Sequence, residues 1–405
     1  MCKMVIRGFL MKDRYLNKLI VEDALASLKI AFVTGPRQVG KTTLCKQILE
    51  QAKEKTAYYT WDDDDFRLAW LQSPKTLVEG KKIVVFDEIH KDRKWKNKLK
   101  GLFDIYGNDT NLIVSGSARL DYFRKSGDSL QGRYFPYRLH PFTLGETPKI
   151  KPPSQRDWFE HATLSDIKLD DLLKLGGFPE PLMGQNLNKA TRWRNLYKER
   201  MIKEDLRDLQ NVRDLSVLDN LSLLLKTKVG GQLSYESIRK DLSVSFESIL
   251  RWIDLLEAVY YCYRIRPYST KIKNSLTKEP KLFLYDWSGI EDEGAKFENM
   301  IAGHLLKNVH LWTDGAMGDF KLFYLRDKQK REVDFLITCN NKPYLLLEVK
   351  SNQNTLTSPL IHYNEVLKPT FCFQLVRETK KERNASLLHP NIRIVHVDKF
   401  LSSLN

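Results

Sequence analysis

The chain has 405 residues, of which 42% are hydrophobic and 11% aromatic, and its net charge is +15. This length and composition predict two or three globular domains and exclude wholesale disorder, a collagen-like fibre and a low-complexity chain. The basic excess favours a polyanionic partner. The sequence has no run of 18 apolar residues, so no membrane helix is expected. The five cysteines are scattered without a C-x-x-C pair, which favours a reducing compartment and disfavours a structural zinc site.

Strand-like apolar runs alternate with polar, helix-like stretches in the first 150 residues. An amphipathic helix is predicted over 11–28, because its apolar residues recur at nearly helical spacing. The alternation that follows is typical of an α/β fold with a parallel sheet and crossover helices. The predicted strands are Ile30–Thr34, Ala57–Trp61, Ile83–Phe86 and Leu112–Val114.

The strongest motif is GPRQVGKT, which fits G-x-x-x-x-G-K-[ST] and lies between the first of these strands and a helical run over Thr43–Lys53. Its two glycines permit a tight turn that points backbone N–H groups at phosphate oxygens, and the start of the helix adds a positive dipole end. Lys41 supplies a charge for the β- and γ-phosphates, and the Thr42 hydroxyl a ligand for Mg²⁺. The predicted ATP-binding residues are Gly35, Pro36, Arg37, Gln38, Val39, Gly40, Lys41, Thr42 and Thr43.

The apolar run Ile83–Phe86 ends in two acidic residues, Asp87 and Glu88. Side chains at the carboxyl end of a strand reach the ligand crevice of an open α/β sheet. We therefore predict that Asp87 holds Mg²⁺ through water and that Glu88 orients and polarises the water that attacks the γ-phosphate. Glu88 and Lys41 are thus predicted catalytic residues. An ordinary acidic turn is the alternative.

Small polar residues and an arginine follow the next predicted strand. Ser115 and Ser117 are placed to sense the γ-phosphate or the attacking water. Arg133 comes after a glycine and is a candidate for neutralising charge on the transferred phosphoryl group, in its own chain or from a neighbouring subunit. These three residues complete the predicted nucleotide site.

Residues 231–281 show a helix, short turn, helix pattern followed by a basic, aromatic hairpin. Leu233–Leu242 and Ser245–Leu256 have helical apolar spacing and serine N-caps. The stretch from Tyr260 to Lys281 contains six Lys or Arg residues and one acid. We predict a winged helix whose wing contacts DNA phosphates; packing, or a lid for the ATPase, is the alternative. The candidate DNA contacts are Arg251, Arg264, Arg266, Lys271 and Lys273.

Acidic residues also recur after residue 282. Two strands are predicted over Glu332–Ile337 and Tyr344–Lys350, and residues two apart on a strand point to the same face. Acids on both strands and on a preceding helix can hold Mg²⁺, while a lysine positions the water of a nuclease. This matches the D…(E)-x-K pattern of restriction-endonuclease-like nucleases. A surface pattern on an edge strand, and a nuclease fold that only binds DNA, are the alternatives. The candidate residues are Glu298, Asp334, Glu348 and Lys350.

In this order the motifs resemble a prokaryotic family of AAA+-type P-loop ATPases that join the ATPase to a winged helix and a restriction-endonuclease-like, PD-(D/E)xK domain. The resemblance implies ATP as the nucleotide, Mg²⁺ as the metal, a cytoplasmic setting, a homo-oligomer and involvement with DNA. It rests on Gly35–Thr43, Val84–Glu88, Ser115–Ser117, Leu130–Arg133, Gly176–Pro179 and the acids Asp334 and Glu348 with Lys350.

A Pro-rich, charged stretch at 148–156 and later changes of pattern divide the chain into four predicted parts. They are a P-loop ATPase domain over 1–150, a helical lid or linker over 151–230, a winged helix over 231–281 and a nuclease-like domain over 282–405. The predicted function is Mg²⁺-dependent binding and hydrolysis of ATP by a protein that acts on, or is regulated by, duplex or branched DNA. An ATP-gated nuclease, and a nucleotide-switched scaffold without enzymatic action on DNA, are the alternatives.

Overall fold

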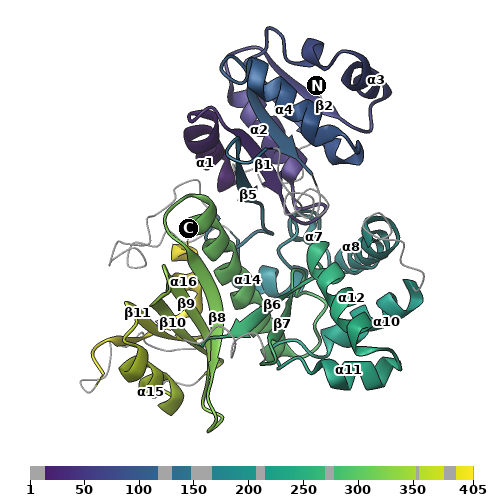
Figure 1. Cartoon of the computed structure of the whole chain (residues 1–405). Coiled ribbons are helices and arrows are strands. Elements are labelled where there is room, and N and C mark those ends of the chain that lie inside the picture. Colours follow the sequence, from purple (N-terminus) through teal and green to yellow (C-terminus); the bar gives the residue numbers. More distant parts are fainter. Residues whose placement is uncertain are drawn as a thin grey trace.

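The computed structural model has two lobes: the P-loop sheet and its helices form the upper one in Figure 1, and the other elements form the lower one. The first element is α1 (Leu16–Leu19), which continues as a π-helical segment over Ile20–Leu25, inside the predicted helix. Among the described helices, none is both long and apolar enough to cross a membrane. The structure describes residues 14–116, 130–146, 167–206, 215–269, 278–352, 355–377 and 389–404.

The upper lobe is built on five parallel strands in the order β2-β3-β4-β1-β5, which confirms the predicted parallel sheet. The sequence pattern did not reveal β5. This strand contains Pro136 and lies at the sheet edge, where a missing N–H donor is tolerated. The strands are β1 (Ile30–Thr34), β2 (Thr56–Thr60), β3 (Ile83–Asp87), β4 (Asn111–Ser115) and β5 (Tyr134–Arg138).

Helices cover both faces of this sheet, because successive side chains of a strand point to opposite faces. Val33 and Leu44 belong to the core beneath α1 and α2, whereas Phe32, Trp70 and Leu99 belong to a second core beneath α3 and α4. Each of these buried side chains contributes roughly 1.5–3 kcal/mol by leaving water. The helices are α2 (Lys41–Gln51), α3 (Asp64–Gln72) and α4 (Trp95–Tyr106).

A helical part follows the P-loop sheet, with the predicted interruption at Gly176–Pro179 between α6 and α7. Gly176 has φ +78°, and a Cβ there would lie 2.7 Å from Asp286 Oδ1, so only glycine fits. The helix α8 continues without a break into a π-helical segment, Met201–Asp205. The helices of this part are α6 (Leu169–Leu175), α7 (Pro179–Gly184), α8 (Leu187–Arg200) and α10 (Leu215–Lys226).

The predicted helix–turn–helix is present as α11 (Tyr235–Leu242) and α12 (Phe246–Ala258). Ser234 and Ser245 are their N-caps, as the sequence predicts, and each accepts a hydrogen bond from a backbone N–H. The hairpin that follows consists of β6 (Cys262–Pro267) and β7 (Lys281–Leu284). Strand β6 also pairs in parallel with β8, so the hairpin is part of the C-terminal sheet.

The C-terminal sheet has the order β12-β11-β10-β9-β8-β6-β7. Strands β8, β9 and β10 form an antiparallel meander, and β11 and β12 then add in parallel, with α15 between β10 and β11 along the chain. The two strands predicted here are β9 and β10. The bounds are β8 (Phe320–Arg326), β9 (Glu332–Cys339), β10 (Lys342–Lys350), α15 (Ser358–Leu367), β11 (Phe371–Val376), β12 (Ile392–His396) and α16 (Val397–Ser403).

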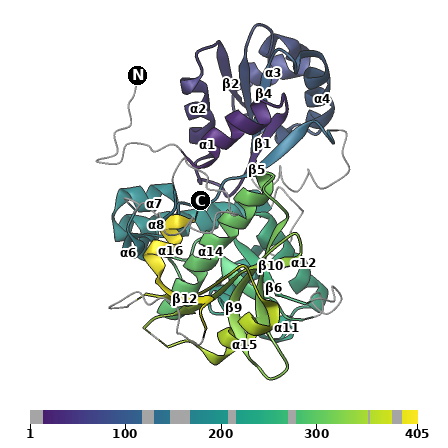
Figure 2. The ribbon, with the colours of Figure 1, turned by 90° about the vertical axis from the view of Figure 1, so that its left-hand side faces the viewer.

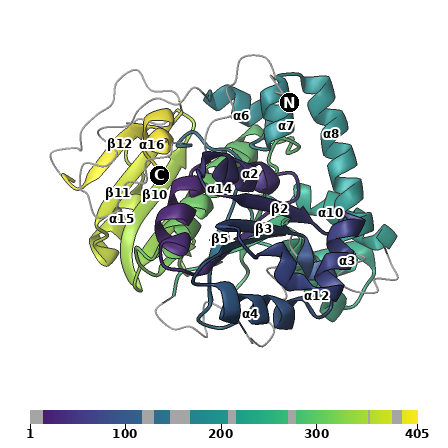
Figure 3. The same cartoon turned by 90° about the horizontal axis from the view of Figure 1, so that it is seen from above.

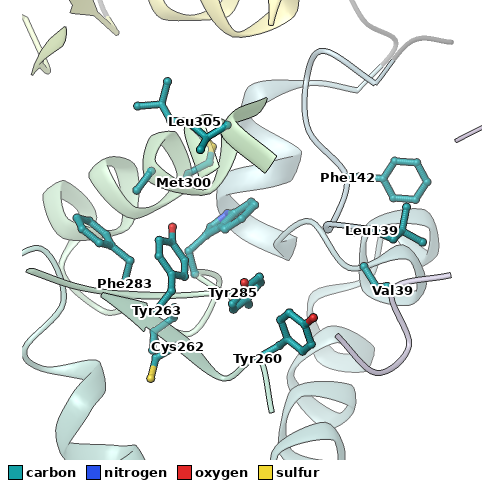
Figure 4. Close-up of a cluster of buried hydrophobic side chains, with 14 of the residues drawn as sticks. Val39, Leu139, Phe142, Tyr260, Cys262, Tyr263, Phe283, Tyr285, Met300 and Leu305 are labelled. Atoms are coloured by element: carbon teal, nitrogen blue, oxygen red, sulfur yellow. The ribbon is translucent and has the colours of Figure 1, made fainter. Parts of the chain in front are cut away.

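The 22-residue helix α14 (Glu293–Asp314) links the two lobes. Its C-terminal end lies against β5 in Figure 2, and Figure 3 shows the C-terminal sheet on one side of the upper lobe and α8 on the other. One hydrophobic core runs through both lobes: Val39 of the P-loop and Leu139 belong to it together with Tyr263 and Met300 (Figure 4). The lobes therefore share one folding unit in which α14 is the central element.

Polar contacts reinforce this junction between β5 and α14. Arg138 pairs with Asp314 through two hydrogen bonds of 2.9 and 2.6 Å. His140 Nε2 lies 2.8 Å from His310 Nδ1, and burial lowers the pKa of His140 well below its ordinary value. A neutral imidazole is therefore the form that fits this contact.

Candidate functional site

The P-loop follows β1 and adopts the left-handed backbone angles that its glycines permit. Gly35 and Gly40 have φ +145° and +102°, and Gln38 has φ +59°. A Cβ at Gly35 would lie 2.3 Å from the backbone oxygen of Leu139, which excludes every other residue type. The loop ends at Gly40, the N-cap of α2, so the positive end of that helix faces the loop.

Lys41 lies folded over the loop, where its Nζ donates to the backbone oxygens of Gly35 and Pro36 at 2.9 and 2.7 Å. Burial lowers its pKa, and the nearby carboxylates of Glu88 and Asp87 oppose that effect. These contacts place a buried ammonium beside the two acids that the sequence singled out. Phosphate oxygens can replace the two carbonyls as acceptors, because all are oxygen acceptors and the phosphates carry full charge.

Asp87 lies at the carboxyl end of β3, beside Ser115 at the end of β4. Its carboxylate accepts hydrogen bonds from Thr42 Oγ1 at 3.1 Å, from Ser115 Oγ at 2.6 Å and from the Tyr58 hydroxyl. The structure thus brings together Thr42, Asp87 and Ser115. The oxygen donors of Thr42 and Asp87 are those that Mg²⁺ prefers, so the residues present fit this metal.

Tyr58, on β2, is a member of this group that the sequence did not single out. Burial raises the pKa of its hydroxyl, and the hydrogen bond to Asp87 raises it further, so it stays a donor to the carboxylate. An aromatic residue in a strand is ordinarily expected to belong to the hydrophobic core. Tyr58 is the middle residue of β2 and pairs with Val85 of the neighbouring β3, so nothing in the local sequence indicates that its hydroxyl reaches Asp87.

Glu88 occupies a left-handed turn, with φ +59°, directly after β3. Its backbone N–H donates to the backbone oxygen of Ser115 at 2.8 Å, and its carboxylate Oε2 lies 3.3 Å from Nε2 of the buried His90. The side chain is 23% exposed. Glu88 therefore has a fixed backbone, lies close enough to Lys41 for its charge to raise the pKa of that lysine, and keeps access to solvent.

Arg133 lies at the opposite end of β1 from the P-loop. Its backbone oxygen accepts from Ile30 N at 2.9 Å, at the first residue of β1, and its guanidinium pairs with Asp104 at 2.7 Å. This contradicts a role at the nucleotide site of its own chain and leaves the neighbouring-subunit interpretation as a prediction. The other sensor candidate, Ser117, lies outside the described residues.

Arg14 supports the P-loop from behind, a role that the sequence did not indicate. Its guanidinium donates to the backbone oxygens of Val39 and His140 at 2.7 and 2.5 Å and to Glu146 at 2.7 Å. Glu146 is buried and also lies 3.5 Å from Nζ of Lys307 on α14. Arg14, Glu146 and Lys307 thus form a buried charge triad that joins the P-loop to α14.

The candidate DNA contacts divide into three groups. Arg264 is engaged by Glu257 and Asp254 and donates to the Tyr235 hydroxyl, which contradicts its prediction as a phosphate contact. Arg251 is exposed on α12, and Arg266 is half-buried on β6. Two of the candidates lie outside the described residues: Lys271 and Lys273.

The C-terminal acids gather as predicted at one place, between α14 and the strands β9 and β10. Asp334 Oδ2 accepts from the backbone N–H of Val349 at 2.8 Å, and Glu348 pairs with Lys350 at 2.6 Å. Burial and the charge of Asp334 raise the pKa of Glu348 to about 7. The second carboxylate oxygen of Glu348 is buried without a hydrogen-bond partner. Asp334, Glu348 and Lys350 therefore lie as an adjoining set.

Lys281 of β7 is an unexpected member of this cluster. Its Nζ lies 3.0 Å from Glu298, 2.7 Å from Glu332 and 3.9 Å from Asp334. Burial alone would lower the pKa of Lys281, but these acids together raise it. Glu298 thus lies beside Asp334 around the same ammonium, and burial together with the charge of Asp334 raises its pKa to about 7. Its role as a metal ligand stays a prediction. In the described residues, no three His, Cys, Asp or Glu side chains form a group able to hold a metal.

Three family models match consecutive parts of the chain. Residues 27–147 match a family model described as an AAA domain, and 166–290 and 293–395 match two models described as domains of unknown function, DUF8612 and DUF4143. An uncharacterized protein of Methanocaldococcus jannaschii is 26% identical over 379 residues, covering 82% of this chain and 78% of that protein. One of Haemophilus influenzae is 24% identical over 350 residues, covering 80% and 85%.

Two solved structures are among the similar ones. The Aeropyrum pernix ORC1 protein in complex with DNA aligns with a TM-score of 0.32 and 13% identity over 74% of this chain and 94% of that one. The Thermotoga maritima RuvB Holliday junction branch migration motor aligns with a TM-score of 0.31 and 16% identity over 65% and 93%. The part of the chain that carries the P-loop and the parallel sheet is therefore similar to an AAA domain.

Proposed function

We propose that this protein binds ATP with Mg²⁺ and hydrolyses it at the P-loop. The observation that carries the proposal is the convergence of a buried lysine, a hydroxyl–carboxylate pair and a second acid at the carboxyl ends of β1, β3 and β4. Together these groups supply a positive charge for the phosphates, ligands for the metal and a base for the attacking water. A turn with a purely structural role needs none of them.

Each residue has a separate task in this proposal. The N–H groups of the loop and Lys41 hold the β- and γ-phosphates, and the Thr42 hydroxyl and Asp87 hold the metal. Bound Mg²⁺ neutralises charge on the phosphates. Glu88 accepts a hydrogen bond from the attacking water and orients it toward the γ-phosphate, while Ser115 keeps Asp87 in place. In a homo-oligomer, Arg133 of one subunit would act at the nucleotide site of its neighbour, where it would neutralise charge on the transferred phosphoryl group.

Replacing Lys41 by alanine is expected to lower ATP affinity and turnover to background, because the buried ammonium is the loop's strongest phosphate contact. The measurement is ATP binding and phosphate release with Mg²⁺, compared with an exposed-lysine control on β8, Lys321→Ala. Equal binding and turnover in wild type and Lys41→Ala would refute the proposed function. Tight ATP binding without turnover in the wild type would favour the nucleotide-switched scaffold instead.

Involvement of DNA is the finer part of the proposal. The three helices α10, α11 and α12 with the β6–β7 hairpin have the element order of a winged helix, and Val229 and Gln232 form short bridges to β7. Arg251 is exposed on the second helix of the pair, where it can reach a phosphate. The same turnover assay with duplex, single-stranded and junction DNA tests this part, and turnover that is unchanged by all three would remove it.

A nuclease is the second candidate function, and the orphaned oxygen of Glu348 beside Asp334 is the observation in its favour. The helix α14, the β8–β9–β10 meander, α15 and the parallel strand β11 also follow the order of a restriction-endonuclease-like core. Incubation of plasmid DNA with the protein, ATP and Mg²⁺ or Mn²⁺ is expected to show cleavage that Glu348→Ala abolishes. Cleavage that is absent, or equal in both proteins, excludes this candidate.

A further inference from the structure

The P-loop contains a second cation, Arg37, and a carboxylate from the helical part of the chain is bound to it. Arg37 Nη1 lies 3.1 Å from Asp205 Oδ1, and the two side chains are 36% and 15% exposed. Asp205 is the last residue of the π-helical segment that continues α8. An acid separated by 168 residues from the loop is therefore held directly at the place where phosphates are to bind.

The negative charge of Asp205 also acts on Lys41. Burial lowers the pKa of Lys41, and Asp205 is among the carboxylates that raise it again, after Glu88 and Asp87. Asp205 is thus close to both side-chain cations of the P-loop. Asp87 accepts from the Thr42 hydroxyl and Glu88 follows β3, whereas Asp205 comes from the π-helical segment after α8. Because Asp87 has the metal role and Glu88 the water role, neither role explains why Asp205 lies at the P-loop.

We propose that Asp205 competes with the phosphates of the nucleotide for Arg37, an inference that rests on the proposed function. Nucleotide binding would then release the segment Met201–Asp205 from the P-loop. A guanidinium binds phosphate oxygens and carboxylate oxygens through the same donor geometry, so one partner displaces the other. The phosphates also bring at least two negative charges toward Asp205, and like charges at such a distance repel. Asp205 is therefore a carboxylate that lowers nucleotide affinity.

The released segment is not isolated, because its neighbours are part of the common core. The apolar side chains around Asp205 are buried: Met201, Ile202 and Leu206. Tyr197, about two turns earlier on α8, is also buried. Displacement of Asp205 therefore acts on a packed helix rather than on a free side chain. Nucleotide binding at the P-loop would therefore shift α8 and the helices that pack on it.

Asp205→Asn keeps the size of the side chain and removes its charge, and is expected to tighten the binding of ADP and of a non-hydrolysable ATP analogue by about three- to tenfold. Asp219→Asn is the matched control, since Asp219 also pairs with a cation of the helical part, Lys198 at 2.7 Å. The control is expected to leave affinity unchanged. Titrations of a fluorescent ADP and of the ATP analogue, both with Mg²⁺, provide the readout, and melting temperatures verify that all variants are folded.

Two further measurements separate competition from a general change. The gain in Asp205→Asn is expected to shrink as salt rises from about 0.05 to 0.5 M, because screening weakens the repulsion. It is also expected to be smaller in the Arg37→Gln background, where the contested cation is gone. Unchanged or weaker binding in folded Asp205→Asn, or an equal gain in Asp219→Asn, overturns the inference. Failure of wild type to bind nucleotide at all would refute the proposed function instead.

Discussion

Replacing Glu88 by glutamine is expected to preserve ATP binding while slowing hydrolysis by about 100- to 10,000-fold, the range typical of losing a positioned general base. Glutamine keeps the length of the side chain and can still occupy the position 3.3 Å from His90 Nε2. It cannot accept the proton of the attacking water. Phosphate release and equilibrium ATP binding, measured on the same protein, provide the two quantities that must separate.

Glu79→Gln is the control for this experiment, because Glu79 is exposed and contacts the Tyr106 hydroxyl away from the P-loop. Its turnover is expected to equal that of the wild type. A Glu88→Gln protein that hydrolyses ATP at the wild-type rate would remove Glu88 from the chemistry. The base would then have to be another group at the carboxyl ends of the strands, and the assignment of roles in the crevice would be wrong.

The second large effect concerns stability: Glu146→Gln is expected to lower the free energy of unfolding by about 3–5 kcal/mol. Glu146 is the carboxylate between the buried cations Arg14 and Lys307, at 2.7 and 3.5 Å. Without its charge, two cations remain buried with no anion to offset their desolvation. Urea unfolding followed by circular dichroism measures the loss. The exposed Glu199→Gln, in which only a surface pair with Lys203 is lost, is expected to stay within about 0.5 kcal/mol of wild type.

The same experiment has a defined pH dependence. Burial raises the pKa of Glu146, but Arg14 and Lys307 outweigh burial and hold it below its ordinary value of 4.5. A carboxyl whose pKa is depressed in the folded state contributes stability above its unfolded pKa, and this contribution is lost as pH falls through the folded pKa. The difference between wild type and Glu146→Gln should therefore be full at pH 7 and diminish below pH 4.5. A difference that is constant down to pH 3 would contradict the charge triad as its cause.

The parts of the fold that the sequence predicted are those whose signals are local. The P-loop, the acids after β3 and the N-caps Ser234 and Ser245 are each determined by a few consecutive residues, and all are found in place. Strand β5 was missed because its Pro136 weakens a strand pattern that only the edge position makes possible. Local chemistry therefore predicted the strands that flank motifs, whereas β8, β11 and β12 and the order of the strands needed the structure.

The site residues that were missed are single charges paired over long separations. Arg14 and Glu146 lie 132 residues apart, and neither belongs to a motif or a periodic pattern. Lys281 counted in the sequence as part of a basic wing, yet it serves as the cation of an acid cluster. The charge of a residue predicts that it needs a partner when buried, but nothing in the adjacent sequence indicates which partner the fold will supply.

The single long helix α14 connects the acid cluster to the lobe that contains the nucleotide site, so a rotation at one of its ends displaces the other. Glu298 sits near its first turn, and the residues that hold the upper lobe, Lys307 and Asp314, follow toward its other end. At 1.5 Å per residue these anchors are about 14 and 24 Å from Glu298 along the axis. A tilt of about 5° around the far anchor would therefore move Glu298 by about 2 Å, more than the margin that keeps an ion pair closed.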